Sequence, residues 1–337
     1  MKETLLWCTL LLLICFPGSP RISGRSSAQG EAKNGPQVTT APLPDVVRVE
    51  ARSEKGFLYP YYLYVPPELR VDKGGGAKQN ILVLPNNTGN SDDDFKVHEA
   101  SAKRLAEGRR TLASSLRVAL VVPVFPRPKS DWRVYTHALD RDSLLTEKKE
   151  LRRFDLQLIG MIDDARDRLR AEGLSFGERI VIYGFSAGGM FANRFTMLHP
   201  DRVRAAAFGS PGGWAMAPVP SWKGKALRYP IGTADFEAVA GKKLDLASLK
   251  KVPVFLFMGA EDTNDSVIYR DSYDQEDQDL IFELFGKTLM ERWPVTEAIY
   301  RESLPAATLK LYSNVGHSVT KEIWNDITAF FSKHLHD

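Results

Sequence analysis

Short apolar runs and helical stripes alternate along most of the chain. Runs rich in β-branched and aromatic residues predict eight strands, at 46–51, 59–65, 80–84, 118–124, 179–183, 204–208, 252–258 and 308–312. The central runs are continuously apolar, which is typical of strands covered on both faces. Apolar residues recur at three- and four-residue steps over 151–169 and 323–335, which predicts amphipathic helices there. We therefore predict one α/β domain over residues 45–337, with a mostly parallel eight-stranded sheet flanked by helices.

One connection between the predicted strands is long and irregular. Residues 211–250 contain several Pro and Gly residues and no clear apolar period. A stretch of that length without structure of its own usually covers or lines a site. We expect it to lie near the functional site.

The first 28 residues have the parts of a secretory signal peptide. Lys2 precedes an almost wholly apolar run from Leu5 to Phe16, and a polar stretch with small residues follows. A helix of that run would span about 18 Å, less than the roughly 30 Å of a bilayer core. We predict a cleaved signal at 1–28, a flexible lead-in at 29–44, and a secreted or periplasmic mature chain with no stable membrane span. The alternative is an uncleaved anchor.

Cysteine usage and charge exclude several classes of site. Cys8 and Cys15 both lie inside the predicted signal, and Ile14 stands where a lipid-attachment site for Cys15 would have a small residue. The mature chain then has no disulfide, thiol nucleophile or cysteine-based metal site. Cleavage brings the formal net charge from +3 to about +1, which argues against a nucleic-acid partner.

The sharpest local motif is Gly184-Phe-Ser186-Ala-Gly188-Gly189, directly after an apolar strand and before a helical run. A nucleophile elbow needs this context, because the serine occupies a tight turn where glycines avoid collisions. The helix behind it aims backbone N–H groups at the reacting oxygen. The alternative is a Gly-rich turn that happens to contain serine. We predict Ser186 as the nucleophile.

A serine nucleophile needs a base, and the base needs an orienting acid. His317 follows the last predicted strand in a glycine-containing loop, and Asp262 follows the strand at 252–258. Glu261 and Asp265 are the alternative acids in the same loop, and each can instead be a solvated turn residue. We predict the triad Ser186–Asp262–His317, whose chain order is that of α/β hydrolases.

These residues resemble the α/β-hydrolase superfamily over roughly 45–337. Tyr62-Leu-Tyr-Val-Pro66 and Gly184 to Met190 resemble secreted esterases of the polyhydroxybutyrate-depolymerase and feruloyl-esterase type. The resemblance implies an oxyanion hole made by the N–H of Ala187 and one from the loop after the third strand.

That loop departs from the family's usual His-Gly pattern. It reads Leu84-Pro85-Asn86-Asn87-Thr88-Gly89, and Pro85 has no N–H to donate. The second donor is therefore Asn86, Asn87 or Thr88, of which we favour Asn87. The alternative is that the asparagines merely form the turn.

Other features have competing interpretations. Trp132, His137 and Trp214 lie in long loops and, together with Asn86 and Thr88, are candidate substrate contacts; loop aromatics equally often pack as satellites. Asp92 to Asp94 precede a helical run and are expected to cap it rather than bind a metal.

We therefore expect a serine hydrolase that cleaves small or polymeric carboxylic esters and needs no cofactor or metal. The rivals are a peptidase or a lactone or thioester hydrolase with the same triad, and a non-catalytic binding module on this scaffold. The acyl and alcohol specificity and the oligomeric state stay open.

Overall fold

The computed structural model describes residues 45–71 and 78–335. The predicted signal peptide at 1–28 and the lead-in at 29–44 lie outside these residues. All eight predicted strands form one sheet, in the order β1-β2-β4-β3-β5-β6-β9-β10. Its strands are β1 (Val47–Val49), β2 (Tyr61–Tyr64), β3 (Ile81–Val83), β4 (Ala119–Pro123), β5 (Ile180–Phe185), β6 (Val203–Gly209), β9 (Val254–Gly259) and β10 (Ala307–Tyr312).

The sheet is parallel from β4 to β10, and β2 pairs antiparallel with both β1 and β4. This confirms the predicted mostly parallel sheet. Because parallel strands end at the same edge, the loops after β3, β5, β6, β9 and β10 open on one side of the molecule. Every catalytic or binding residue predicted from the sequence lies in the segment after one of these strands or in the loop after β4.

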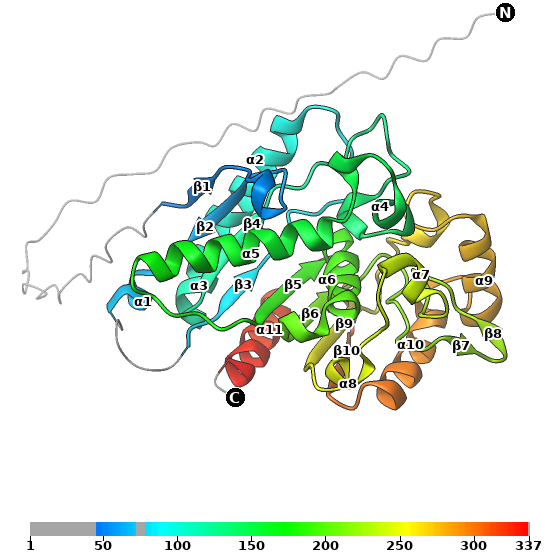
Figure 1. Ribbon diagram of the computed structural model, residues 1–337. Coiled ribbons are helices and arrows are strands. Elements are labelled where there is room, and N and C mark those ends of the chain that lie inside the picture. Colours follow the sequence, from blue (N-terminus) through cyan, green and yellow to red (C-terminus); the bar gives the residue numbers. More distant parts are fainter. Residues whose placement is uncertain (1–44, 72–77, 336–337) are drawn as a thin grey trace, which may run out of the picture. The chain divides into compact units, whose positions relative to one another are not determined.

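Helices cover both faces of the sheet (Figure 1). The longer ones are α2 (Phe95–Gly108), α3 (Arg110–Leu116), α5 (Phe154–Ala171), α6 (Ala187–Leu198), α9 (Gln275–Phe285), α10 (Leu289–Ser303) and α11 (Lys321–His334). Side chains of α5 and α6 pack on one face, and those of α2, α3 and α11 pack on the other. The predicted stripe at 151–169 is confirmed by α5, whose Leu158, Ile162 and Leu169 are fully buried.

Residues 211–250 are more ordered than the sequence indicated. They contain the small hairpin β7 (Ser221–Trp222) and β8 (Lys225–Ala226), and the short helices α7 (Phe236–Ala240) and α8 (Leu246–Leu249). These elements are only two to five residues long, so no apolar period could develop in the sequence. The remaining helices, α1 (Pro67–Val71) and α4 (Arg141–Leu145), are equally short.

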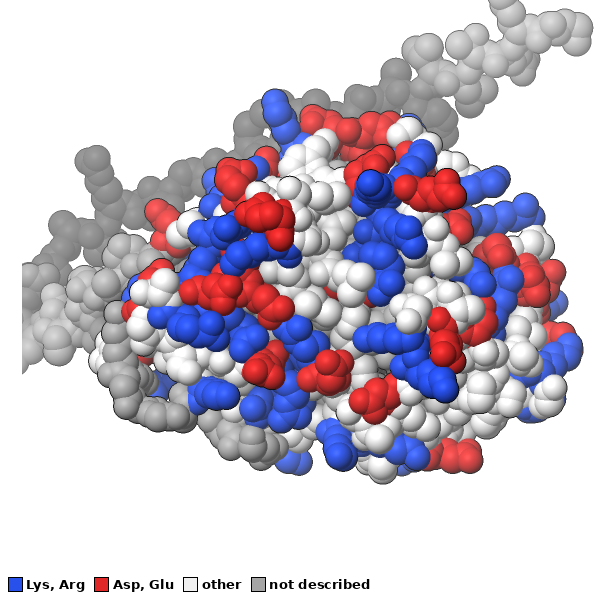
Figure 2. All heavy atoms as spheres, viewed as in Figure 1, with Lys and Arg blue, Asp and Glu red and all other residues white. Residues whose placement is uncertain are grey.

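Two further expectations concern the surface. Asp94 caps α2 by accepting a hydrogen bond from the Lys96 N–H, as predicted, while Asp93 accepts from Ser130. The face drawn in Figure 2 mixes basic and acidic side chains without a large patch of one sign. No helix in the described part of the chain is long and apolar enough to cross a membrane.

Candidate active site

Ser186 occupies a sharp turn between β5 and α6. Its backbone has φ 58° and ψ −124°, a region that non-glycine residues enter only when the surrounding structure holds them there. Two hydrogen bonds hold it: the Ser186 N–H donates to Gly209 O at 3.0 Å, and the Met190 N–H donates to Ser186 O at 3.0 Å. The strained backbone is thus anchored both to β6 and to the first turn of α6.

The glycines of the motif are required by close backbone approaches. A Cβ on Gly184 would lie 1.9 Å from Gly188 O, and one on Gly189 would lie 2.6 Å from Gly209 O. No side chain fits at either distance. The turn therefore needs glycine at both positions, which explains why the motif carries more glycines than chance would place there.

The N-terminus of α6 begins immediately after Ser186. The first N–H groups of a helix have no partner within it, and the helix dipole adds partial positive charge there. Ala187 is the first residue of this 12-residue helix. An oxygen that becomes negative beside Ser186 would face these N–H groups.

His317 and Asp262 meet across the loops that follow β10 and β9. His317 Nδ1 donates to Asp262 Oδ2 at 2.9 Å, and the Asn264 N–H donates to Asp262 Oδ1 at 2.9 Å. The Asp262 side chain is 1% exposed and that of His317 is 23% exposed. Burial raises the pKa of Asp262, but the interactions with His317, Ser210 and the Asn264 N–H outweigh it and lower that pKa below its usual value. Asp262 therefore stays ionised beside the imidazole.

The two loops are held together by their backbones. The Glu261 N–H donates to Val315 O at 2.9 Å, and a Cβ on Gly259 would lie 2.1 Å from the same oxygen. The imidazole of His317 in turn packs 4.7 Å from the ring of Phe185, the residue before Ser186. The structure thus places this imidazole beside the strained turn. Within the described residues no hydrogen bond joins the Ser186 and His317 side chains.

The other two candidate acids have different surroundings. Glu261 is exposed. Asp265 forms a two-point ion pair with Arg292, with N···O distances of 2.9 and 2.8 Å. Among these three acids, Asp262 is the one that contacts His317.

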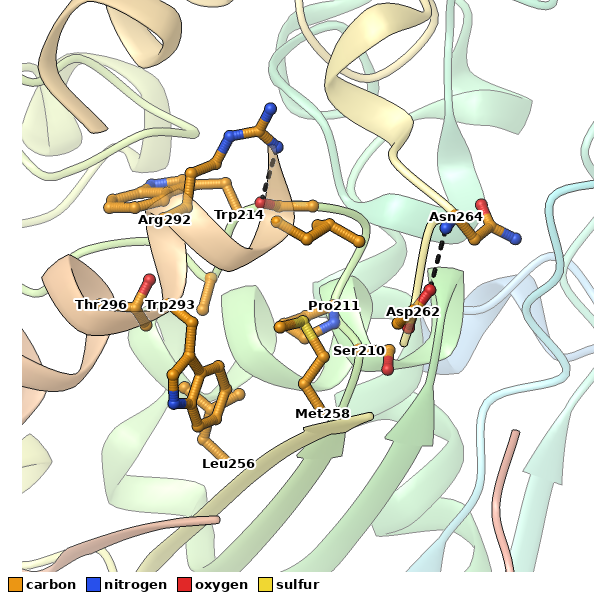
Figure 3. Close-up of a pocket in the computed structure, with 13 residues that line it drawn as sticks. Ser210, Pro211, Trp214, Leu256, Met258, Asp262, Asn264, Arg292, Trp293 and Thr296 are labelled. Carbon is orange, nitrogen blue, oxygen red and sulfur yellow. Dashed lines mark hydrogen bonds between the residues drawn. The ribbon is translucent and has the colours of Figure 1, made fainter. Parts of the chain in front are cut away.

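Arg292 connects several of the loops around Asp262. Its side chain is 1% exposed and also donates to the carbonyl oxygens of Gly213, Gly286 and Lys287. It therefore ties α10 to the loops after β6 and β9. Figure 3 shows Arg292 near Trp214 and Asp262 on the opposite side of a small cavity, which has a volume of about 20 Å³. That is room for about one water molecule, so it is too small for an acyl chain.

The loop after β3 is braced by His137. The Thr88 N–H donates to His137 Nδ1 at 3.1 Å, and His137 Nε2 donates to Phe125 O at 2.6 Å. Burial lowers the pKa of His137 to about 3, so the ring is neutral and can accept at Nδ1. Asn87 Nδ2 donates to His137 O at 2.7 Å, and the amide of Asn86 exchanges hydrogen bonds with Phe125.

These contacts distinguish the three candidates for the second oxyanion-hole donor. The Thr88 N–H is already bound to the His137 ring, so it is not free for a reacting oxygen. The side chains of Asn86 and Asn87 stabilise the loop, as expected if the asparagines form the turn. The backbone N–H groups of Asn86 and Asn87 have no hydrogen-bond partner among the described residues. The backbone of Asn87 lies against Gly188 at the start of α6, with 3.7 Å from a Cβ on Gly188 to Asn87 O.

The candidate aromatic contacts are not brought together. Trp132 is 42% exposed, and its ring contact is with Arg133. Trp214 is 2% exposed, stacks on Phe285 and lines the small cavity. His137 is buried inside the β3 loop. These three of the five predicted substrate contacts therefore occupy separate environments, while His137 contacts the loop after β3, which contains the other two, Asn86 and Thr88.

A larger cavity of about 310 Å³ lies beside the nucleophile turn. Its wall combines the loop after β3, α2, the end of β5 and the start of α11, through Leu84, Pro85, Asn86, Asn87, Thr88, Ser101, Leu105, Arg109, Tyr183, Gly184, Phe185, Gly188, Val319 and Trp324. This volume is in the range of small-molecule sites. No group of three His, Cys, Asp or Glu side chains among the described residues is placed to hold a metal ion.

No protein-family profile and no curated protein matches this sequence. A search of solved structures does give matches, and poly(aspartic acid) hydrolase-1 from Sphingomonas sp. KT-1 superposes with a TM-score of 0.56 at 19% identity, over 88% of this chain and 100% of that one. The chain has the α/β-hydrolase fold.

Two other α/β-hydrolase structures match with lower TM-scores. A poly(3-hydroxybutyrate) depolymerase from Bordetella parapertussis gives 0.48 at 16% identity, over 85% of this chain and 87% of that one. An S-formylglutathione hydrolase from Agrobacterium tumefaciens gives 0.48 at 17% identity, over 86% and 92%. At these identities the likeness concerns the α/β-hydrolase fold and not the substrate.

Several contacts of the site had no signal in the sequence. Arg292 lies 27 residues beyond Asp265 in α10, and nothing in its neighbourhood marks it as a partner of that loop. His137 was predicted as a candidate substrate contact, yet its ring accepts a hydrogen bond from the N–H of Thr88, 49 residues away. Both are long-range pairings, which only the fold defines.

Proposed function

We propose that this protein is a serine hydrolase that cleaves carboxylic esters through an acyl-enzyme on Ser186. The observation that carries the proposal is the Asp262–His317 hydrogen bond beside a strained serine at the start of α6. Serine needs such an oriented base, because its hydroxyl is a weak nucleophile at neutral pH. The fold shared with solved hydrolases is consistent with this chemistry.

In the proposed reaction His317 Nε2 takes the proton of the Ser186 hydroxyl as Oγ attacks the ester carbonyl. The carbonyl oxygen becomes negative, and the N–H groups of Ala187 and Asn87 donate to it. Collapse expels the alcohol, which receives the proton from His317. Water then attacks the acyl-enzyme with the same base, and the acid is released. Asp262 keeps Nδ1 protonated and stabilises the imidazolium.

The lack of a hydrogen bond between the Ser186 and His317 side chains in the described structure is compatible with this scheme, because catalytic hydrogen bonds often tighten only when substrate is bound. Asn87 is proposed as the second donor because Thr88 is occupied by His137 and Asn87 borders the α6 terminus. Trp132 is exposed in the loop after β4 and has no part in the proposed reaction.

The test is hydrolysis of p-nitrophenyl acyl esters of increasing chain length, followed by labelling with a fluorophosphonate probe. We expect turnover that ends when the probe has reacted, with the added mass on the peptide that contains Ser186. Parallel assays with an anilide and a thioester separate the peptidase and thioesterase rivals. Ester turnover that continues after complete labelling, or a probe that reacts elsewhere, would contradict the proposal. Absence of both turnover and labelling would favour the binding module.

We also propose that the chain is exported by the signal at 1–28. The support is the apolar run of Leu5 to Phe16 with its polar, small-residue flank. When the full-length chain is expressed in a secreting bacterial host, intact-mass measurement is expected to find a product that begins after Gly24 or Ala28. A membrane-bound product that retains Met1 would show an anchor instead.

A further inference from the structure

The 310 Å³ cavity beside the nucleophile turn contains one charged side chain, Arg109. Arg109 lies at the junction where α2 ends and α3 begins, and its guanidinium sits over the ring of Trp324 at 4.4 Å. The rest of the wall is backbone, apolar and aromatic surface, and neutral polar groups. An elongated ligand in this cavity would therefore meet a single positive charge.

Arg109 has no carboxylate partner in the described chain. Its side chain donates to the carbonyl oxygen of the adjacent Gly108 at 3.5 Å, and its buried Nε has no hydrogen-bond partner. The nearest acids along both helices are engaged elsewhere: Glu107 pairs with Lys103, and Asp326 pairs with Lys310. A partly buried guanidinium without a counter-ion is unfavourable, so this position is suited to an anion that arrives with a ligand.

Two buried arginines, Arg292 and Arg127, each have a carboxylate within 2.9 Å. A third, Arg194, donates instead to Ala138 O and Ser272 Oγ. None of the three lines this cavity. Asn87 also lines the cavity, and its Oδ1 has no hydrogen-bond partner among the described residues.

The cavity borders the proposed reaction centre through residues next to Ser186, although Ser186 and His317 themselves do not line it. Asn87 and Gly188 lie on its wall beside the N-terminus of α6, and Phe185 lines it while contacting the His317 ring. A part of the substrate that extends from the reacting carbonyl into this space would pass the aromatic side chains before it reached Arg109.

We infer that Arg109 binds a carboxylate on the substrate, so that the preferred esters carry a negative charge at one end. The guanidinium can donate two parallel N–H bonds to a carboxylate, while Trp324 holds its plane. This inference rests on the proposed ester hydrolysis for its kinetic test, but the binding site itself can be tested without turnover.

The kinetic test compares isosteric esters. One carries a carboxylate on the acyl side (4-nitrophenyl hemiglutarate), one carries it on the alcohol side (4-carboxyphenyl butyrate), and each has a neutral methyl-ester counterpart. We expect one charged ester to have the higher kcat/KM, and Arg109→Gln to lower its charged-to-neutral ratio about 10- to 100-fold, the worth of a hydrogen-bonded charge. Arg109→Lys should restore part of the ratio. Arg104→Gln, which removes an exposed charge of the same helix, is the matched control and should not change the ratio.

The binding test uses the thermal midpoint of the protein with glutarate or the neutral glutaramide. A stabilisation by glutarate that Arg109→Gln abolishes supports the site, and it does so even when no ester is turned over, an outcome that would contradict only the proposed reaction. Turnover with no charge preference, or a preference that Arg109→Gln leaves intact, would overturn the inference. Equal stabilisation by glutarate and glutaramide, or by neither, would also overturn it.

Discussion

Replacing Ser186 by alanine is expected to lower kcat for the preferred ester by about 10⁵- to 10⁶-fold, the loss seen when a triad nucleophile is removed. The reason is that no other group can form the acyl-enzyme. The fold should persist, because alanine keeps the Cβ and the two backbone hydrogen bonds that hold the turn are unchanged. Steady-state kinetics and the thermal midpoint measure both effects.

Ser318 offers a matched control for this substitution. It follows His317 and is exposed, so Ser318→Ala removes a hydroxyl beside the base without touching the turn. We expect near-normal kinetics from it. Should Ser186→Ala keep more than about 1% of the wild-type kcat, an acyl-enzyme on Ser186 would no longer be tenable.

Asp262→Asn and Asp265→Asn are expected to have opposite effects, although the two residues share one loop. Asp262→Asn should lower kcat by about 10⁴-fold, because an amide at this position favours the wrong imidazole tautomer. Asp265→Asn removes the counter-ion of Arg292, which is 1% exposed, and should lower the free energy of unfolding by about 3–5 kcal/mol. Steady-state kinetics and denaturant unfolding of both variants give the kcat and the free energy of unfolding that test these two expectations.

The comparison decides which carboxylate orients the base. A large kinetic loss in Asp265→Asn with normal kinetics in Asp262→Asn would reverse the assignment. Glu261→Gln is the control for both variants. Because the Glu261 side chain is exposed, we expect this substitution to change neither activity nor stability measurably.

Local features of the sequence were enough to predict the sheet and the sharp turn at Ser186. Buried parallel strands are continuously apolar, and the steric demand on Gly184 comes from Gly188, two residues beyond Ser186. The loops bearing Asp262 and His317 were also foreseen, because each follows a recognisable strand. The two loops meet because β9 and β10 are parallel neighbours.

Choices between neighbouring residues could not be made from the sequence. Asp262 and Asp265 differ because Arg292 reaches one of them from a distant helix, and Thr88 is removed as a donor by a histidine from the loop after β4. The cavity that Arg109 lines depends on the contact of Arg109, at the junction of α2 and α3, with Trp324 of α11. No local sequence pattern predicts that contact. Long-range packing thus determined the roles within segments whose positions were predictable.

The complete burial of α6 limits which amino-acid substitutions this helix can accept. All 12 residues of this helix are buried, so nearly every substitution on it changes core volume, and such changes commonly cost about 1–5 kcal/mol. The helix that follows Ser186 therefore tolerates little variation. The exposed positions of the surrounding loops and of α2 can be substituted with much less effect on core volume.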